Sequence, residues 1–229
     1  MQKMKPLIVV LAVALVGGIV LTATGVIYPN VIDRYVMNRV LPSRCTAYDH
    51  AMLKLSELWS NENYLEGSIP IVAHGDERAY AWLESSAKAM ALSEAFVSSL
   101  KYAVGRRRPD GELNRKNSSF PSSHASSAFA FATTLATHYP EHGPKVFEVA
   151  LYVGLSRIYL ERHYPGDVIG GAAIGVAAAM ASEIYLSWLH FDRDTILGIL
   201  LFISGSGTPD EIETPLFQSG EHPGQPRDA

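Results

Sequence analysis

Hydrophobic residues recur at helical intervals through most of the chain, and alternating strand patterns extend over no more than a few residues. Amphipathic spacing predicts packing helices between residues 31 and 59. A long helical stretch follows over 76–107, with Asp76 as a plausible N-cap. Further helices are predicted over 123–137, 146–161 and 168–189. The pattern is therefore that of an all-α, single-domain helical bundle.

The amino terminus carries the clearest targeting signal. Lys3 and Lys5 precede an uncharged run, 7–27, and its 21 residues could cross a hydrocarbon core. The positive-inside bias then predicts that the domain after it is exported, lying on the extracytoplasmic, periplasmic side of an inner membrane. A membrane anchor over 1–29 is the preferred interpretation. A signal peptide cleaved near Ala23 or Gly25 is the alternative, and it would leave a periplasmic or secreted protein.

Two later helices raise the question of further membrane spans. In 76–107, Glu84 and Lys88 stand four residues apart, a spacing that favours a helix in water over a membrane span. The 168–189 stretch is mostly Ala, Gly, Ile and Val, and could span a bilayer by length. We interpret it as a buried central helix, in which Gly171 and Gly175 permit close helix packing.

Length and composition narrow the class of protein. A chain of 229 residues suits one domain, which we place at 30–203, and the Gly-, Pro- and acid-rich segment 204–229 is predicted to be a disordered tail. A net charge of −4 gives no global basic field, which argues against a nucleic-acid partner. The single cysteine, Cys45, excludes an intramolecular disulfide and a thiolate zinc cluster.

Three separated segments hold polar residues that a helical core would otherwise avoid. In KYAVGRRRP, 101–109, Lys101 and Arg108 are seven residues apart, so a continuous helix would place both on one face, where they would suit an anion. PSSH, 121–124, stands at a helix start, where unpaired N–H groups and the helix dipole can cradle a phosphate. SRIYLERHYPGD, 156–167, ends one helix and begins the next.

These strings resemble, in order and spacing, the signature of the type 2 phosphatidic acid phosphatase superfamily, which includes class A bacterial acid phosphatases and vanadium haloperoxidases. The matching residues are Lys101, Arg108, Pro109, Pro121, Ser122, His124, Ser156, Arg157, His163 and Asp167. Ser123 stands where the family usually has glycine, the residue that permits the closest backbone approach to a phosphate. The resemblance implies the helical fold of the acid phosphatases and haloperoxidases.

The resemblance also implies a role for each residue. His163 would attack phosphorus and form a phosphohistidine, while Asp167 holds the other ring nitrogen. His124 would give a proton to the leaving alcohol. The charge on the transferring phosphoryl group would be met by the phosphate-binding residues Lys101, Arg108, Ser122, Ser123 and Arg157. No metal or cofactor is expected, because the cations supply the positive charge.

Plain structural explanations exist for single residues. Asp167 and Ser122 could be helix caps only, and Arg157 could pair with Glu161 four residues later. Caps and surface pairs do not predict two histidines and three cations at these spacings, so the set favours function. Arg106 and Arg107 are interpreted as solvated or near lipid headgroups.

The predicted activity is hydrolysis of phosphomonoesters or diphosphates, on a lipid or a small molecule. A tether near the membrane would favour lipid substrates. The alternative is a vanadium-dependent, haloperoxidase-like oxidase that uses the same site, with His163 as the metal ligand. A phosphate-binding protein without turnover is a third possibility.

Overall fold

The computed structural model describes residues 29–41, 45–59, 76–114 and 116–186, together with residues 190, 192 and 195. Within these ranges the regular structure is entirely helical, which confirms the all-α prediction. The predicted anchor or signal segment and the predicted tail lie outside the described residues. The domain limits of 30 and 203 therefore stay predictions.

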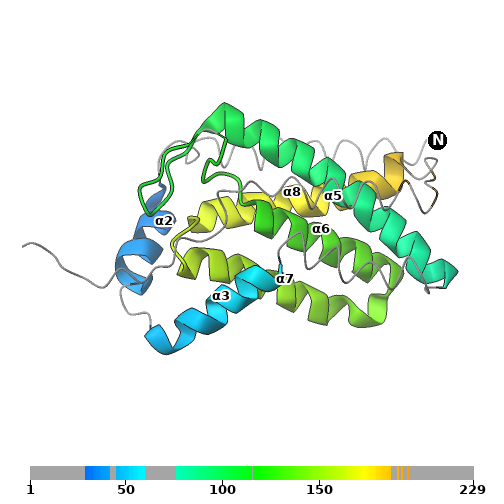
Figure 1. Cartoon of the computed structure of the whole chain (residues 1–229), viewed down its shortest axis with the longest axis horizontal. Coiled ribbons are helices and arrows are strands. Elements are labelled where there is room, and N and C mark those ends of the chain that lie inside the picture. The colour runs from blue at the N-terminus through cyan, green and yellow to red at the C-terminus, as the bar shows by residue number, and fades with distance from the viewer. Residues whose placement is uncertain are drawn as a thin grey trace, which may run out of the picture.

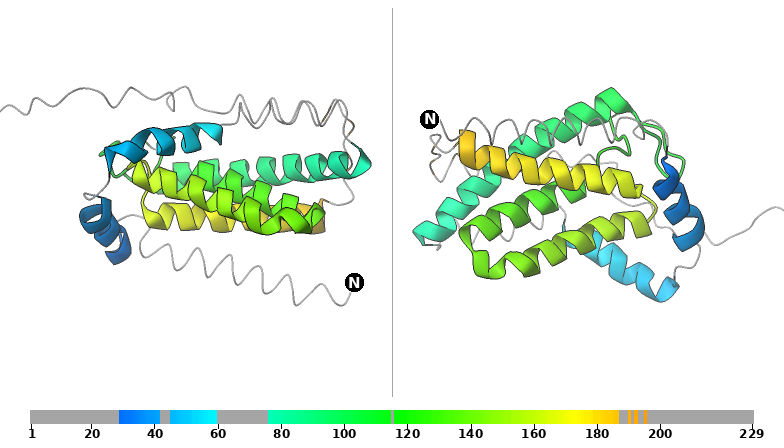
Figure 2. Two further views of the ribbon diagram at one scale, coloured as in Figure 1. Left: turned by 90° about the horizontal axis from the view of Figure 1, so that it is seen from below. Right: turned by 180° about the vertical axis from the view of Figure 1, so that it is seen from behind.

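Four helices lie side by side and form the body of the bundle (Figure 1). They are α5 (Glu77–Val104), α6 (Ser123–His138), α7 (Gly143–Tyr159) and α8 (Pro165–Tyr185). Helix α6 contacts the other three. The shorter elements are α2 (Val31–Tyr35), η1 (Val36–Val40), η3 (Thr46–Tyr48), α3 (Asp49–Leu58) and η4 (Pro140–His142). Helix α3 packs against α7, and α2 lies at the end of the bundle where α8 begins (Figure 2).

The ends of α5 explain one wrong prediction. Asp76 caps the helix as predicted, and its side chain accepts a hydrogen bond of 2.8 Å from the Ala79 N–H. At the other end Gly105 adopts a left-handed conformation, φ 59°, and its N–H bonds to the Lys101 carbonyl at 3.0 Å. Glycine takes this conformation at little cost, so the helix stops there. Arg108 therefore lies in a loop, and the prediction that it shares a helix face with Lys101 is wrong.

The Glu84–Lys88 pair, whose spacing was interpreted as favouring a helix in water over a membrane span, is buried. The Lys88 Nζ lies 2.9 Å from the Glu84 Oε1, with both side chains largely covered. Lys88 also donates a hydrogen bond of 3.2 Å to the carbonyl of Leu186, at the end of α8. The spacing was a correct sign of an ion pair, but α8 covers it, and the pair links α5 to α8.

Glycines set the distance between α6 and α8. A Cβ atom on Gly171 would overlap the carbonyl oxygen of Ser122, and one on Gly175 would overlap that of Ser126. The two backbones therefore touch, which confirms the predicted close packing. Among the described helices, α8 is also the one long and apolar enough to cross a membrane.

Helix α8 is buried on one face rather than on all sides. Its most apolar window is 39% buried, and Ile169 on its outer side is 65% exposed. The buried face packs on α5 and α6. The interpretation as a buried central helix therefore holds for that face only, and the length and composition that suit a membrane span also occur in core helices.

Candidate functional site

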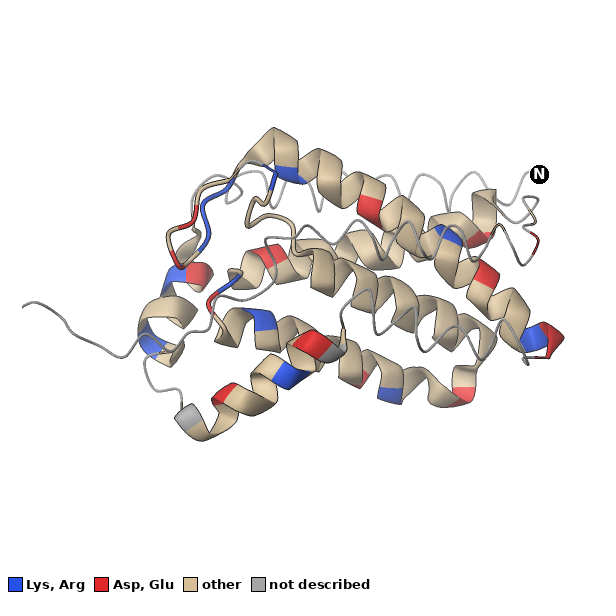
Figure 3. Cartoon of the chain, in the orientation of Figure 1, with Lys and Arg blue, Asp and Glu red and all other residues tan. Residues whose placement is uncertain are grey.

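The three polar segments converge at one end of the bundle. They are the loop after α5, the start of α6 and the turn between α7 and α8, and basic positions gather there (Figure 3). The Ser122 N–H donates a 3.1 Å hydrogen bond to the Asp167 carbonyl, and the Ser119 N–H donates a 2.9 Å bond to the Arg106 carbonyl. Backbone bonds thus hold segments together that are far apart in the sequence.

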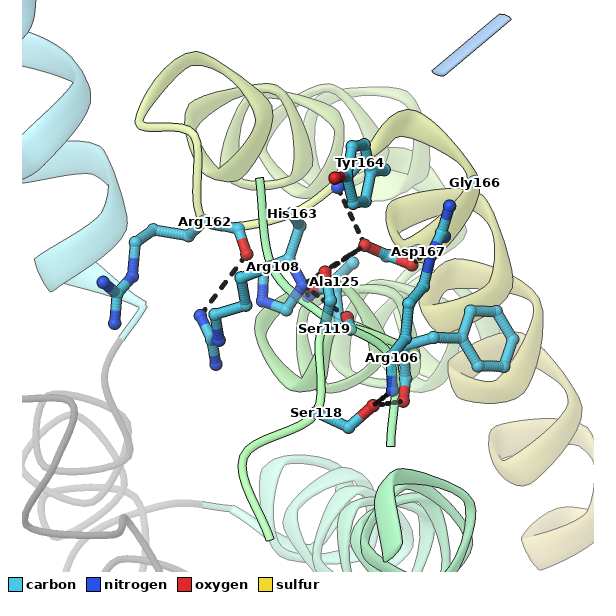
Figure 4. Close-up of polar contacts among 12 residues, drawn as sticks. Arg106, Arg108, Ser118, Ser119, Ala125, Arg162, His163, Tyr164, Gly166 and Asp167 are labelled. Atoms are coloured by element: carbon cyan, nitrogen blue, oxygen red, sulfur yellow. Dashed lines mark hydrogen bonds and ion pairs between the residues drawn. The ribbon is translucent and has the colours of Figure 1, made fainter. Parts of the chain in front are cut away.

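His163 lies at the centre of this region and is only 1% exposed. Its Nδ1 is 2.7 Å from the carbonyl oxygen of Ser119, whereas the Asp167 Oδ2 is 3.9 Å from the same nitrogen (Figure 4). The prediction that Asp167 bonds the ring directly is therefore wrong in its geometry. Asp167 instead accepts a 2.5 Å bond from the Ser119 hydroxyl, so it acts on the ring through Ser119.

The second ring nitrogen of His163 is differently placed. Nε2 is buried and has no hydrogen-bond partner among the residues that the structure describes. A proton on Nδ1 can be donated to the Ser119 carbonyl, which leaves a lone pair on Nε2. The ring is therefore held through one nitrogen, while the other is available to react.

Three of the predicted phosphate-binding residues act on His163. Burial lowers the pKa of its imidazole well below the usual value, and the charges of Arg108, Arg157 and Lys101 lower this pKa further. The contact with the Ser119 carbonyl opposes them. The imidazole is therefore neutral near pH 7, as a nucleophilic nitrogen must be. The structure thus brings together the histidine and three cations that the motifs singled out.

Each arginine of this set is held by neighbours. Arg108 donates through Nε to the Asn117 carbonyl at 3.2 Å and through Nη2 to the Asn117 side chain, and its Nη1 lies 3.4 Å from the Arg162 carbonyl. Arg157 donates to the hydroxyl of Ser56 on α3. Lys101 is buried in the last turn of α5. Fixed cations lose little freedom when they meet an anion, which favours binding and catalysis.

The start of α6 corrects one predicted donor. Ser122 is the N-cap: its side chain accepts a bond from the Ala125 N–H, and its own N–H is engaged by the Asp167 carbonyl. The Ser122 N–H is therefore already bonded within the protein, contrary to the prediction that it would bind a phosphate. Ser123 and His124 are half-buried in the first turn of α6, and their predicted roles stay predictions.

Arg106 was interpreted as solvated, but it is buried. Its guanidinium bonds to the carboxylates of Asp33 and Asp167 and lies 4.4 Å from the centre of the Tyr164 ring. Arg106 lies inside the first motif, and this position was a sequence signal that it belongs to the site. Asp33 gave only a local signal, the capping box that it forms with Asn30. Ser119 gave none.

Ser156 and Asp167 also have structural partners. Ser156 is buried, and its hydroxyl donates a 2.7 Å bond to the Val153 carbonyl one turn earlier in α7. Asp167 is not the N-cap of α8 but its third residue, and its side chain accepts a 2.8 Å bond from the N–H of Tyr164, the N-cap. The cap explanation and a role in the site are therefore compatible for Asp167.

The lowered pKa of His163 predicts a pH dependence of stability. Below about pH 6.5 the unfolded chain takes up a proton on this residue, but the folded chain does not, so stability falls as the pH falls. The slope is at most about 1.4 kcal/mol per pH unit, until the pH reaches the folded pKa. Denaturant unfolding between pH 7 and 5 should show a weaker pH dependence for His163→Gln than for the wild type. His142→Gln, the same change at an exposed position, is the control and should track the wild type.

The described residues thus form an all-α bundle that holds a buried imidazole close to three cations. A family model described as the PAP2 superfamily matches residues 85–194, which include all three motifs. Over this part of the chain, just under half of its length, the protein is similar to the PAP2 superfamily.

Individual relatives agree with this assignment. The chain is 40% identical over 106 residues to a lipid A 1-phosphatase of Porphyromonas gingivalis, a match that covers 43% of this chain but only 23% of that protein. It resembles the crystal structure of Aquifex aeolicus LpxE with a TM-score of 0.57 and 26% identity, over 66% of this chain and 93% of the other. A PAP2 type phosphatidylglycerolphosphate phosphatase of Bacillus subtilis shares the fold, with a TM-score of 0.58 and 20% identity over 83% and 98% of the two chains.

Proposed function

We propose that this chain is a phosphatase that removes phosphate from lipids, as a monoester or diphosphate hydrolase, through a phosphohistidine on His163. One observation carries the proposal: a buried, neutral imidazole is held at Nδ1 by Ser119, while its Nε2 is left without a hydrogen-bond partner among the described residues. A nucleophile for phosphoryl transfer needs this combination of a fixed ring and an available lone pair.

The reaction has two steps. Nε2 of His163 attacks phosphorus while the bond from phosphorus to the leaving oxygen breaks, and His124 gives that oxygen a proton. Water then attacks phosphorus while the bond from phosphorus to Nε2 of His163 breaks, His124 takes a proton from the water, and inorganic phosphate leaves. Lys101, Arg108 and Arg157 stabilise the charge on the phosphoryl oxygens in both steps.

Two observations favour a lipid substrate. The Porphyromonas gingivalis relative is a lipid A 1-phosphatase. In addition, the outer face of α7 exposes Leu151, Tyr152 and Leu155, and α8 exposes Ile169. Exposed apolar side chains of this kind suit contact with a membrane or detergent.

The proposal includes the location of the enzyme. The amino-terminal apolar run would tether the domain to the inner membrane, with the site on the extracytoplasmic side. A tethered site works close to lipid headgroups, so a lipid phosphate would reach it without leaving the bilayer surface.

A comparison of substrates tests the proposed function. We expect kcat/KM for detergent-dispersed lipid A to exceed that for 4-nitrophenyl phosphate by at least about tenfold, because binding energy from the lipid part contributes to the transition state. His163→Ala should remove both activities. Equal or reversed values would contradict the lipid preference, and no phosphate release from either substrate would contradict the phosphatase itself.

A further inference from the structure

A chain of buried contacts links α2 to the loop that holds His163. The Asp33 carboxylate is fully buried; its Oδ2 accepts a 2.7 Å bond from the Arg106 Nη2, and its Oδ1 accepts a 2.8 Å bond from the Gly166 N–H. The Nη1 of Arg106 donates to the Oδ1 of Asp167. Arg106 therefore bridges two carboxylates that come from different helices.

The contacts continue to the proposed nucleophile. The Asp167 Oδ2 accepts bonds from the Ser119 hydroxyl at 2.5 Å and from the Tyr164 N–H at 2.8 Å. The carbonyl of the same serine lies 2.7 Å from the His163 Nδ1 (Figure 4). The sequence of direct contacts is thus Asp33, Arg106, Asp167, Ser119 and His163.

Charge makes Asp33 more than a packing residue. The side chains of Arg106, Asp33 and Asp167 are at most 2% exposed, so each charge depends on its partners rather than on water. When one partner of a buried ion pair is removed, the remaining charge is no longer compensated, and neighbouring groups must shift to compensate it. Without the charge of Asp33, Arg106 would be drawn toward Asp167 alone, and the turn between His163 and Asp167 would shift.

Asp33 also lies outside the sequence features from which the site was identified. It belongs to none of the three motifs and precedes the residues that the PAP2 superfamily model matches, 85–194. It acts at two points of the first turn of α8, directly on the Gly166 N–H and through Arg106 on Asp167. The contacts reach the ring of His163 but include none of the three proposed phosphate-binding cations.

We propose that Asp33 is a positioning residue for His163: it fixes Arg106 and the Gly166 N–H, and thereby holds the imidazole in line with the phosphorus. This inference rests on the proposed function. A misplacement of about 1 Å can cost about a hundredfold in rate. Loss of Asp33 should therefore lower kcat and leave phosphate binding intact.

The test uses the full chain carrying Asp33→Asn, which removes the charge and keeps the shape. We expect kcat per folded molecule to fall about ten- to hundredfold, with the Ki of inorganic phosphate unchanged within about twofold. Asp49→Asn is the matched control, because Asp49 also links an early helix to α7, by accepting a 2.7 Å bond from the Tyr159 hydroxyl. This control should keep the wild-type kcat.

Each outcome bears on the proposal. A kcat within about twofold of wild type would overturn it, and so would a fall in kcat matched by an equal rise in Ki, the sign of a general structural defect. If Asp33→Asn does not fold, Asn30→Ala replaces it. Asn30 fixes Asp33 by two bonds, Asp33 N–H to Asn30 Oδ1 at 2.8 Å and Asn30 N–H to Asp33 Oδ2 at 3.2 Å.

For Asn30→Ala the same two quantities, kcat and the Ki of inorganic phosphate, are measured. We expect kcat to be about three- to tenfold lower and Ki to be unchanged. An unchanged kcat in this variant would overturn the inference. Activity that survives in His163→Ala would overturn the proposed function instead, so the two failures can be told apart.

Discussion

Replacing His163 with alanine is expected to abolish turnover and the covalent intermediate together. The nucleophilic nitrogen is removed, so kcat should fall by at least about 10,000-fold. The measurement is incubation with a substrate carrying labelled phosphate, followed by an alkaline quench. Alkali preserves a phosphohistidine and destroys an acyl phosphate, so wild-type protein should retain label and His163→Ala should retain none.

Two controls make this result specific. His142→Ala, at an exposed position on η4, should label like the wild type. His163→Ala should also keep a circular dichroism spectrum like that of the wild type, which excludes unfolding as the cause. Label that survives in His163→Ala would mean that another residue receives the phosphoryl group.

Replacing His124 with alanine is expected to slow the reaction without preventing the covalent step. Loss of a general acid costs about 100- to 10,000-fold when the leaving alcohol needs a proton. With an alkyl or lipid phosphate, label should therefore appear slowly. With 4-nitrophenyl phosphate, whose leaving group needs little help, label should form readily and then persist, because water attack on the phosphohistidine also lacks its base.

The comparison of leaving groups decides the role of His124. An equal loss of rate with both substrates, and no persistent label, would contradict a proton-transfer role and would favour a role in binding. Ser127→Ala is a useful control on the same helix, because the Ser127 hydroxyl bonds to the His124 carbonyl at 3.2 Å and does not reach the ring through that contact. It should leave the leaving-group dependence unchanged.

The helices could be predicted from sequence because they depend on local patterns. The Asp76 cap, the close approach at Gly171 and Gly175, and the start of α6 after Ser122 all follow from neighbouring residues. The cations were correctly grouped with His163 for a different reason, since the resemblance to a known signature carried spatial information that spacing alone does not contain.

The errors concern contacts between residues far apart in the chain. Arg106 looked solvated because its partner Asp33 lies 73 residues earlier, and nothing in either segment indicates the other. The spacing of Glu84 and Lys88 indicated an ion pair but not its burial, because the end of α8, which covers it, lies about 100 residues later in the chain. Asp167 was predicted to bond to the His163 ring, but the acceptor is the carbonyl of Ser119. A backbone acceptor cannot be recognised from the residue type. Burial and backbone bonding are thus what a single sequence could not provide.

The contact between the α6 and α8 backbones limits how this site can change its specificity. At Gly171 and Gly175 no side chain separates the two helices, so no substitution there can bring them closer, and a larger residue at Gly171 would displace Ser122 together with its bond to Asp167. The spacing of α6 and α8 at Ser122 is therefore set by backbone contact. We expect adaptation to bulkier or smaller substrates to come from α3 and from the loop between α5 and α6, where the side chains of Ser56 and Asn117 accept bonds from the arginines.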